Sequence, residues 1–136
     1  MRKIGLDIGN VRIGVAVSDL MGIIANARET YTRKSEEADI AYFTEYARAN
    51  EADTFVLGLP VNMDGTDGER VRLTREFGDL LKAASGLPVV YKDERLTTVQ
   101  AERLLIEADM RRDKRKKVID KVAACIILQS YLDGKH

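Results

Sequence analysis

The segment that most constrains the fold lies near the start of the chain and reads IGLDIGNVRIGVAVSD, from Ile4 to Asp19. Bulky aliphatic residues alternate with small or polar ones on both sides of Gly9-Asn10. A period of two is typical of β-strands, and a Gly-Asn pair is a turn signal. The segment therefore predicts a hairpin with one bulky face and one small face. Asp7 stands on the small face, and glycines beside it would leave room for a metal and a phosphate.

The rest of the chain predicts alternating strands and helices. A third strand is expected at 22–30 and a helix at 35–50, capped by Ser35. The apolar run TFVLGLP at 54–60 is typical of a parallel strand buried on both faces. A helix at 67–85 ends at Gly86, and a strand follows at 88–94. A third helix begins after Thr97, and a last helix follows the basic stretch 111–117 and ends near Asp133.

This order, βββαβαβαα, predicts an α/β fold with a mixed sheet and helices on its faces. Without a repeat or a linker, residues 1–136 read as a single domain. The 22 basic and 22 acidic residues cancel, so any affinity for nucleic acid must come from local clusters. A single cysteine, Cys125, excludes an internal disulfide, and this favours a reducing, cytoplasmic setting. Its side chain is expected in the core. No signal peptide or membrane span is expected.

Three acidic positions stand out. Asp7 interrupts the first strand, Asp93-Glu94 ends the last strand, and Asp120 precedes the apolar run VAACIIL. Each has an ordinary interpretation: Asp7 in a turn or ion pair, Asp93-Glu94 in a surface turn with Arg95, Asp120 at a helix N-terminus. Together, acids on three elements can bind Mg²⁺ or Mn²⁺, which prefer oxygen ligands. Since one cysteine and a terminal histidine cannot form a zinc site, carboxylates are the expected metal ligands.

The stretches LDIGNVRIGVAVSD, VLGLPVNMDGT, YKDERLTTVQAERLL and IDKVAACIILQSYL together resemble the YqgF/RuvX family, a branch of the RNase H-like nucleases. The resemblance covers nearly the whole chain except the first helix. It implies a five-stranded mixed sheet, its first three strands antiparallel, flanked by helices on both faces. It also implies a metal-dependent nuclease site of Asp7, Glu94 and Asp120, holding Mg²⁺ or Mn²⁺. Members are described as Holliday junction resolvases and as nucleases that trim the 5′ end of pre-16S rRNA.

One departure concerns the wider fold. Related resolvases carry an acid at the end of the fourth strand, where this chain reads LGLP, from Leu57 to Pro60. Glu94, one strand over, is the candidate replacement, so one ion or two are both open. Asp93 ranks below Glu94, because neighbouring strand residues point in opposite directions.

Phosphate contacts are expected from two further segments. The turn-rich stretch after the fourth strand contains Asn62, and its backbone amides suit a phosphate. The basic stretch before Asp120 is a candidate backbone-binding loop, although charge runs are usually solvated surface. Arg12 and Arg95 are expected to touch phosphate or to hold a carboxylate, and Arg70 and Arg72 to lie on a helix surface. The predicted nucleic-acid-binding residues are Asn62, Arg95, Arg111, Arg112, Lys114, Arg115, Lys116 and Lys117.

The sequence thus predicts a hydrolase that cleaves phosphodiester bonds, with pre-16S rRNA favoured as substrate. The alternatives are a Holliday junction resolvase acting on branched DNA and a non-catalytic factor that binds RNA or the ribosome. An actin-like ATPase or sugar kinase shares the DIGNVRIGVAVSD pattern but needs two such domains. Expected partners are structured RNA or branched DNA, with a pre-ribosomal particle as a further candidate, and the oligomeric state is left as monomer or homodimer.

Overall fold

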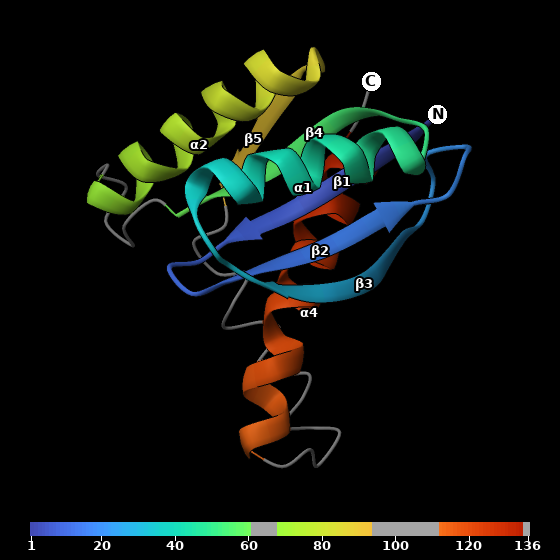
Figure 1. The fold of residues 1–136 in the computed structure, drawn as a ribbon. Helices are drawn as coiled ribbons and strands as arrows, with labels where there is room; N and C mark the ends of the chain where they lie inside the picture. The colour runs from blue at the N-terminus through green and yellow to red at the C-terminus, as the bar shows by residue number, and fades with distance from the viewer. Residues whose placement is uncertain (61–67, 94–111, 135–136) are drawn as a thin grey trace.

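The structure, a computed structural model, describes residues 1–60, 68–93 and 112–134, with side chains of the last stretch from residue 120 onward (Figure 1). The strands are β1 (Arg2–Ile8), β2 (Arg12–Ser18), β3 (Ala25–Thr32), β4 (Ala52–Leu59) and β5 (Val89–Asp93). The helices are α1 (Glu36–Ala49), α2 (Glu69–Ser85) and α4 (Arg112–Asp133).

All five strands form one sheet in the order β3-β2-β1-β4-β5. β1 pairs antiparallel with β2, and β2 with β3, while β4 lies parallel to both β1 and β5. The expected mixed sheet with three antiparallel strands is therefore confirmed. β4 lies between two parallel neighbours, which explains why its sequence is a continuous apolar run.

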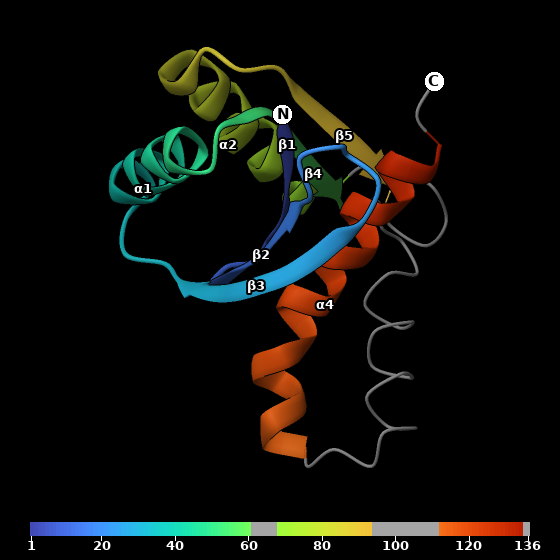
Figure 2. The ribbon, with the colours of Figure 1, turned by 90° about the vertical axis from the view of Figure 1, so that its right-hand side faces the viewer.

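Helices cover both faces of the sheet, as expected (Figure 2). α1 and α2 lie on one face, where Phe43 and Phe77 pack against the bulky residues of β1 and β2. α4 lies on the other face, where Ala124 and Leu128 pack against small residues of the sheet such as Ala16. Each fully buried phenylalanine or leucine contributes about 1.5–3 kcal/mol of hydrophobic stabilisation.

The helix ends follow the expected capping chemistry. The Ser35 side chain accepts a hydrogen bond from Ala38 N and caps α1, and Gly86 ends α2 with a left-handed φ of 74°. One detail differs from expectation: the third strand begins later, at Ala25. The predicted helix after Thr97 lies outside the described residues. In the described part of the chain, no helix has the length and apolar character needed to cross a membrane.

Candidate nuclease site

Asp7 lies on the face of β1 that is turned toward α4. Ile4, Leu6 and Ile8 point to the other side and join the core beneath α1 and α2. The strand alternation places Gly5 and Asp7 opposite them. A Cβ built on Gly5 would come within 2.7 Å of Leu128 Cβ, so this glycine makes room for α4. The expectation that Gly5 leaves space for a metal or phosphate is therefore wrong: the helix fills that space.

Asp120 is brought to the same face through Gly14. Gly14 is the cross-strand partner of Asp7 in the β1–β2 pair, so the two Cα atoms lie about 4.5–5.5 Å apart. A Cβ on Gly14 would lie 1.9 Å from the backbone oxygen of Asp120. α4 thus crosses β2 directly over Gly14. Asp7 and Asp120, far apart in sequence, lie on one face of the sheet within one strand of each other.

Arg12 holds the side chain of Asp120. Arg12 Nε donates a 2.8 Å hydrogen bond to Asp120 Oδ2, and the Asp120 side chain keeps 22% of its exposure. Of the two roles expected for Arg12, holding a carboxylate is the one the structure shows. Among the described residues the bond uses one carboxylate oxygen and one guanidinium nitrogen. Within that part of the chain, Asp120 Oδ1 is available to a cation and the remaining N–H groups of Arg12 to an anion.

Two further arginines brace the end of β1 from the opposite face. Arg70 Nη2 of α2 donates to the backbone oxygen of Ile8 at 3.0 Å, and Arg33 Nη1 donates to that of Gly9 at 3.0 Å. Both acceptors directly follow Asp7. Arg70 is exposed on α2, as expected for a helix surface, and its guanidinium nevertheless reaches the backbone of β1. No periodicity marks a charged residue whose side chain reaches a carbonyl group 62 positions away, so this contact could not be predicted from the sequence.

Arg33 is itself fixed by a buried carboxylate that sequence reasoning missed. Asp39 is fully buried at the start of α1 and accepts hydrogen bonds from Arg33 Nε at 2.8 Å and from Tyr31 Oη at 2.8 Å. Burial alone would raise the pKa of Asp39, but the bonds from Arg33, from Lys34 N and from Tyr31 outweigh it and hold the pKa below 3.8. Burial and the neighbouring Asp39 raise the pKa of Tyr31 to about 12. Asp39 is therefore ionised and anchors the arginine that holds the turn after Asp7.

The third predicted ligand, Glu94, lies outside the described residues, as do Asn62, Arg95 and Arg111. Asp93 is described and pairs in register with Leu59 at the end of β4. Asp93 is two positions after Tyr91 on β5, so both side chains point to the same face of the sheet. Tyr91 packs against the core on the α2 side, and Asp93 therefore lies on the face away from Asp7. Gly58 of the LGLP stretch lies one residue beyond the Leu6–Leu57 pair, level with Asp7.

The basic stretch differs from expectation in its backbone. Sequence reasoning treated it as a loop before the last helix, whereas α4 begins at Arg112 and includes Lys114, Arg115, Lys116 and Lys117. The side chains of these five residues lie outside the described part of the structure. Since α4 starts eight positions before Asp120, this acid lies more than two turns into the helix. Stabilisation by the helix dipole, which fades after the first turn, does not account for it.

Oxygen ligands from Asp7 and Asp120 suit a hard divalent cation such as Mg²⁺ or Mn²⁺. Among the residues that the structure describes, no three His, Cys, Asp or Glu side chains are grouped closely enough to bind a metal. The described pair is therefore two thirds of the predicted set, and Glu94 would complete it.

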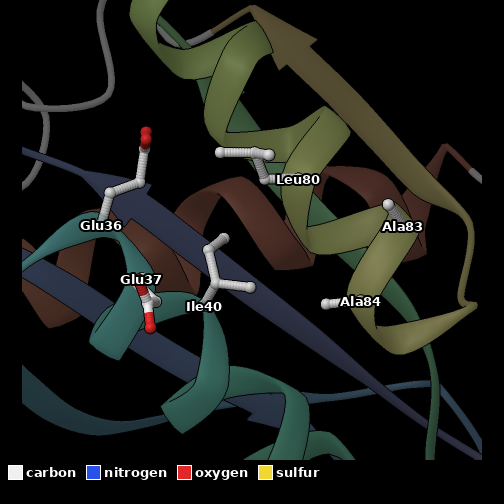
Figure 3. A pocket seen from close by; sticks show the side chains of 6 residues that line it. All are labelled: Glu36, Glu37, Ile40, Leu80, Ala83 and Ala84. Atoms are coloured by element: carbon white, nitrogen blue, oxygen red, sulfur yellow. The ribbon is translucent and has the colours of Figure 1, made fainter.

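A hollow on the face covered by α1 and α2 is lined by other residues than those of the candidate site. This hollow, of about 450 Å³, lies between α1 and α2, where Ile40 and Leu80 approach from two sides and Glu36 stands at the edge (Figure 3). Its lining is mostly apolar and includes neither Asp7 nor Asp120. The candidate catalytic site is therefore on the α4 face.

Comparisons with known proteins agree with this fold and show the family. A protein of Streptococcus thermophilus named "Putative pre-16S rRNA nuclease" is 50% identical over 136 residues, covering 98% of each chain. A protein of the same name from Symbiobacterium thermophilum is 52% identical over 135 residues, covering 99% of this chain and 94% of the relative.

Solved structures show the same fold at low sequence identity. RuvC of T. thermophilus in complex with a Holliday junction substrate has a TM-score of 0.62 at 12% identity, covering 96% of this chain and 92% of the other. The Fowlpox virus resolvase in complex with Holliday junction DNA has a TM-score of 0.61 at 13% identity, covering 98% and 97%. The architecture is therefore that of the RuvC-like, RNase H-fold resolvases.

The family model described as "RuvX: Holliday junction resolvase" matches residues 1–134. With half of all positions identical to curated relatives along the full alignment, the resemblance seen in the sequence is confirmed. The chain belongs to the RuvX (YqgF) family, a family of nucleases that hydrolyse phosphodiester bonds of nucleic acids.

Proposed function

We propose that this chain is a metal-dependent nuclease that processes the 5′ end of pre-16S rRNA, with Asp7, Glu94 and Asp120 as the metal ligands. The observation that carries the proposal is the crossing of α4 over Gly14, which brings Asp120 beside the cross-strand partner of Asp7. The names of the two curated relatives support the RNA substrate.

The chain's own part in the reaction is to hold and to orient. A divalent cation bound here would activate a water molecule and stabilise the charge on the leaving oxygen. Asp7 is fixed by strand pairing, and the Arg12 bond restricts the rotation of Asp120. The N–H groups of Arg12 other than Nε are suited to a phosphate oxygen next to the scissile bond. The basic first turns of α4, 112–117, would bind the flanking backbone.

A cleavage assay on matched substrates tests this proposal. Purified protein is given a pre-16S rRNA 5′ fragment, single-stranded DNA and a four-way DNA junction, with Mg²⁺, Mn²⁺ or EDTA. We expect cleavage of the RNA that needs the metal and is lost in Asp7→Asn, with RNA binding and thermal stability retained. Asp79→Asn is the matched control, because Asp79 is an exposed aspartate on α2. Wild-type rates in Asp7→Asn, with the same metal dependence, would refute the site.

Junction resolution is the second candidate function, favoured by the two structural neighbours that hold Holliday junctions. It predicts that the four-way junction is cut faster than the RNA fragment and that the protein acts as a dimer, since a junction has two equivalent scissile positions. Metal-independent RNA binding without cleavage of any substrate would instead identify a non-catalytic factor.

A further inference from the structure

The turn between β2 and β3 exposes a cluster of large apolar side chains. Leu20, Met21, Ile23 and Ile24, which we call the apolar tip, are 53%, 76%, 59% and 57% exposed. Single exposed apolar residues are common on protein surfaces, but here four large ones lie within five positions on one turn. Such patches in soluble proteins mark interaction sites.

The apolar tip is held rigidly by its own backbone. Asp19 Oδ1 accepts hydrogen bonds from Ile23 N at 2.7 Å and Ile24 N at 3.0 Å, and Asp19 N donates to Ile24 O at 3.1 Å. Gly22 turns the chain with a φ of 70° and donates to Asp19 O at 3.1 Å. These bonds fix the backbone of the turn that carries the four exposed side chains.

Distant parts of the chain brace the same turn. Gln129 of α4 donates through Nε2 to Ile23 O at 3.0 Å, and its Oε1 accepts from Ala25 N at 2.8 Å. The N-terminal ammonium of Met1 donates to Leu20 O at 3.3 Å. A loop that is already ordered loses less conformational freedom when it binds, so a braced apolar turn is suited to binding a partner.

The apolar tip lies far from the candidate catalytic site. β2 runs from Arg12, which holds Asp120, to Ser18, which precedes the turn. Seven strand residues span roughly 20 Å. Figure 1 shows the β2–β3 turn and the β1–β2 turn at opposite ends of the sheet. A partner bound at the tip would therefore leave the catalytic site open to substrate.

The chemistry of the tip selects the kind of partner. Residues 19–24 contain one charged side chain, the carboxylate of Asp19, whereas RNA and anionic membranes are bound by Lys and Arg. Four side chains on a turn offer a few hundred Å², on the order of half the 800 Å² that each partner of a stable interface buries. Contact between two tips would therefore bury too little area to hold a homodimer by itself, whereas on a particle the tip adds to the RNA contacts that the same chain makes at its α4 end. A convex apolar turn fits a concave apolar pocket in another protein.

We propose that the apolar tip docks the nuclease onto a protein component of the particle that carries its RNA substrate. This inference rests on the proposed function, since that function identifies the particle as an immature small ribosomal subunit. Docking by the tip and phosphate binding by the α4 end would then divide recognition between protein and RNA at opposite ends of the sheet.

The test compares a particle with naked RNA. The double variant Met21→Ser/Ile23→Ser keeps Asp19 and Gly22, and Leu73→Ser/Leu80→Ser is the matched control on α2, where the two leucines are 42% and 46% exposed. Binding to purified immature small subunits is measured by co-sedimentation, and cleavage is measured on a protein-free pre-16S fragment. We expect the tip variant to bind the particle about tenfold more weakly, as for loss of an interface anchor, with cleavage of the fragment unchanged. The control should alter neither.

Three results would overturn the docking proposal. The first is wild-type binding of the particle by the tip variant. The second is a wild-type dimer that becomes monomeric in the tip variant, which would make the tip a contact between copies. The third is tip-dependent binding to phosphatidylcholine–phosphatidylglycerol vesicles. Failure of the wild type to cleave the fragment would refute the nuclease proposal but not the docking, because binding is measured independently of cleavage.

Discussion

Arg12 and Asp120 form an ion pair of 2.8 Å that joins the first residue of β2 to α4 across 108 positions of sequence. The pair fixes one oxygen of a proposed metal ligand before any metal arrives. It also places a positive charge beside that ligand. Arg12 therefore orders the side chain of Asp120 but lowers the affinity of the site for cations.

Replacing Arg12 by Gln should therefore strengthen metal binding. Removal of a unit positive charge a few ångströms from the ligand lowers the repulsion of a divalent cation, and at this partly exposed site we expect about a three- to tenfold lower Kd for Mn²⁺. Isothermal titration calorimetry measures it. The melting temperature should change little, since Arg12 is 41% exposed and such pairs contribute at most about 1 kcal/mol. Weaker Mn²⁺ binding in Arg12→Gln would contradict this account.

Adding one methyl group at Gly14 should displace α4. The new Cβ of Gly14→Ala would lie 1.9 Å from Asp120 O, a backbone atom that cannot rotate away. We expect a loss of about 3 kcal/mol or more in the free energy of unfolding, together with loss of cleavage. Urea denaturation followed by circular dichroism measures the first quantity. Gly22→Asn is the control, because Gly22 has open space around it and asparagine tolerates its φ of 70°. Equal stabilities for the two variants would show that α4 does not need Gly14.

The buried carboxylate of Asp39 should control stability at low pH. Its pKa is lowered in the folded state, so its contribution is fully present above the unfolded value near 3.8 and is lost as the pH falls through the lower folded pKa. Asp39→Asn should cost about 3 kcal/mol at pH 7, because Arg33 loses its buried partner. The variant's unfolding free energy should also vary less between pH 5 and pH 2.

Asp53→Asn provides the comparison. Asp53 pairs with Lys3 at 2.6 Å, and its side chain is 36% exposed, so we expect a loss below about 1 kcal/mol. Urea titrations at a series of pH values test both variants. If Asp39→Asn were as mild as Asp53→Asn, the proposed anchoring of Arg33 would be incorrect.

The thiol of Cys125 should react slowly in the folded protein. The side chain is half-buried and donates to Ala25 O at 3.4 Å, and burial raises its pKa above 9.0. Less thiolate is therefore present at pH 8 than for an exposed cysteine. Alkylation by iodoacetamide, followed by mass spectrometry, should be at least about tenfold faster in urea than in buffer. Equal rates would place the thiol on the surface.

Periodicity and capping residues predicted most strands and helices, because each of these elements depends on residues that are close in sequence. The alternation from Ile4 to Val17 predicted the hairpin, the apolar run at 54–60 predicted the parallel strand buried on both faces, and Ser35 and Gly86 marked helix ends. Each signal depends on neighbours within a few residues. The resemblance to a known family supplied the five-stranded sheet with three antiparallel strands, while the order of the strands comes from the structure alone.

Contacts between distant segments could not be predicted in this way. The sequence singled out Asp7 and Asp120 but not the reason they meet, which is the absence of a side chain at Gly14. Gly5 was interpreted as space for a ligand, although the space belongs to Leu128 of α4. The charge run at 112–117 was interpreted as a loop, although it forms the start of α4. Lysine and arginine occur both in solvated loops and on exposed helices, so a charge run does not distinguish the two.

The central claim is that Asp7 and Asp120 share one divalent cation, and Mn²⁺ binding followed by electron paramagnetic resonance tests it most directly. The account predicts saturable binding by the wild type and at least about tenfold weaker binding in both Asp7→Asn and Asp120→Asn, as expected for loss of a carboxylate ligand. Asp79→Asn should bind as the wild type does. Unchanged Mn²⁺ affinity in both site variants would contradict the account.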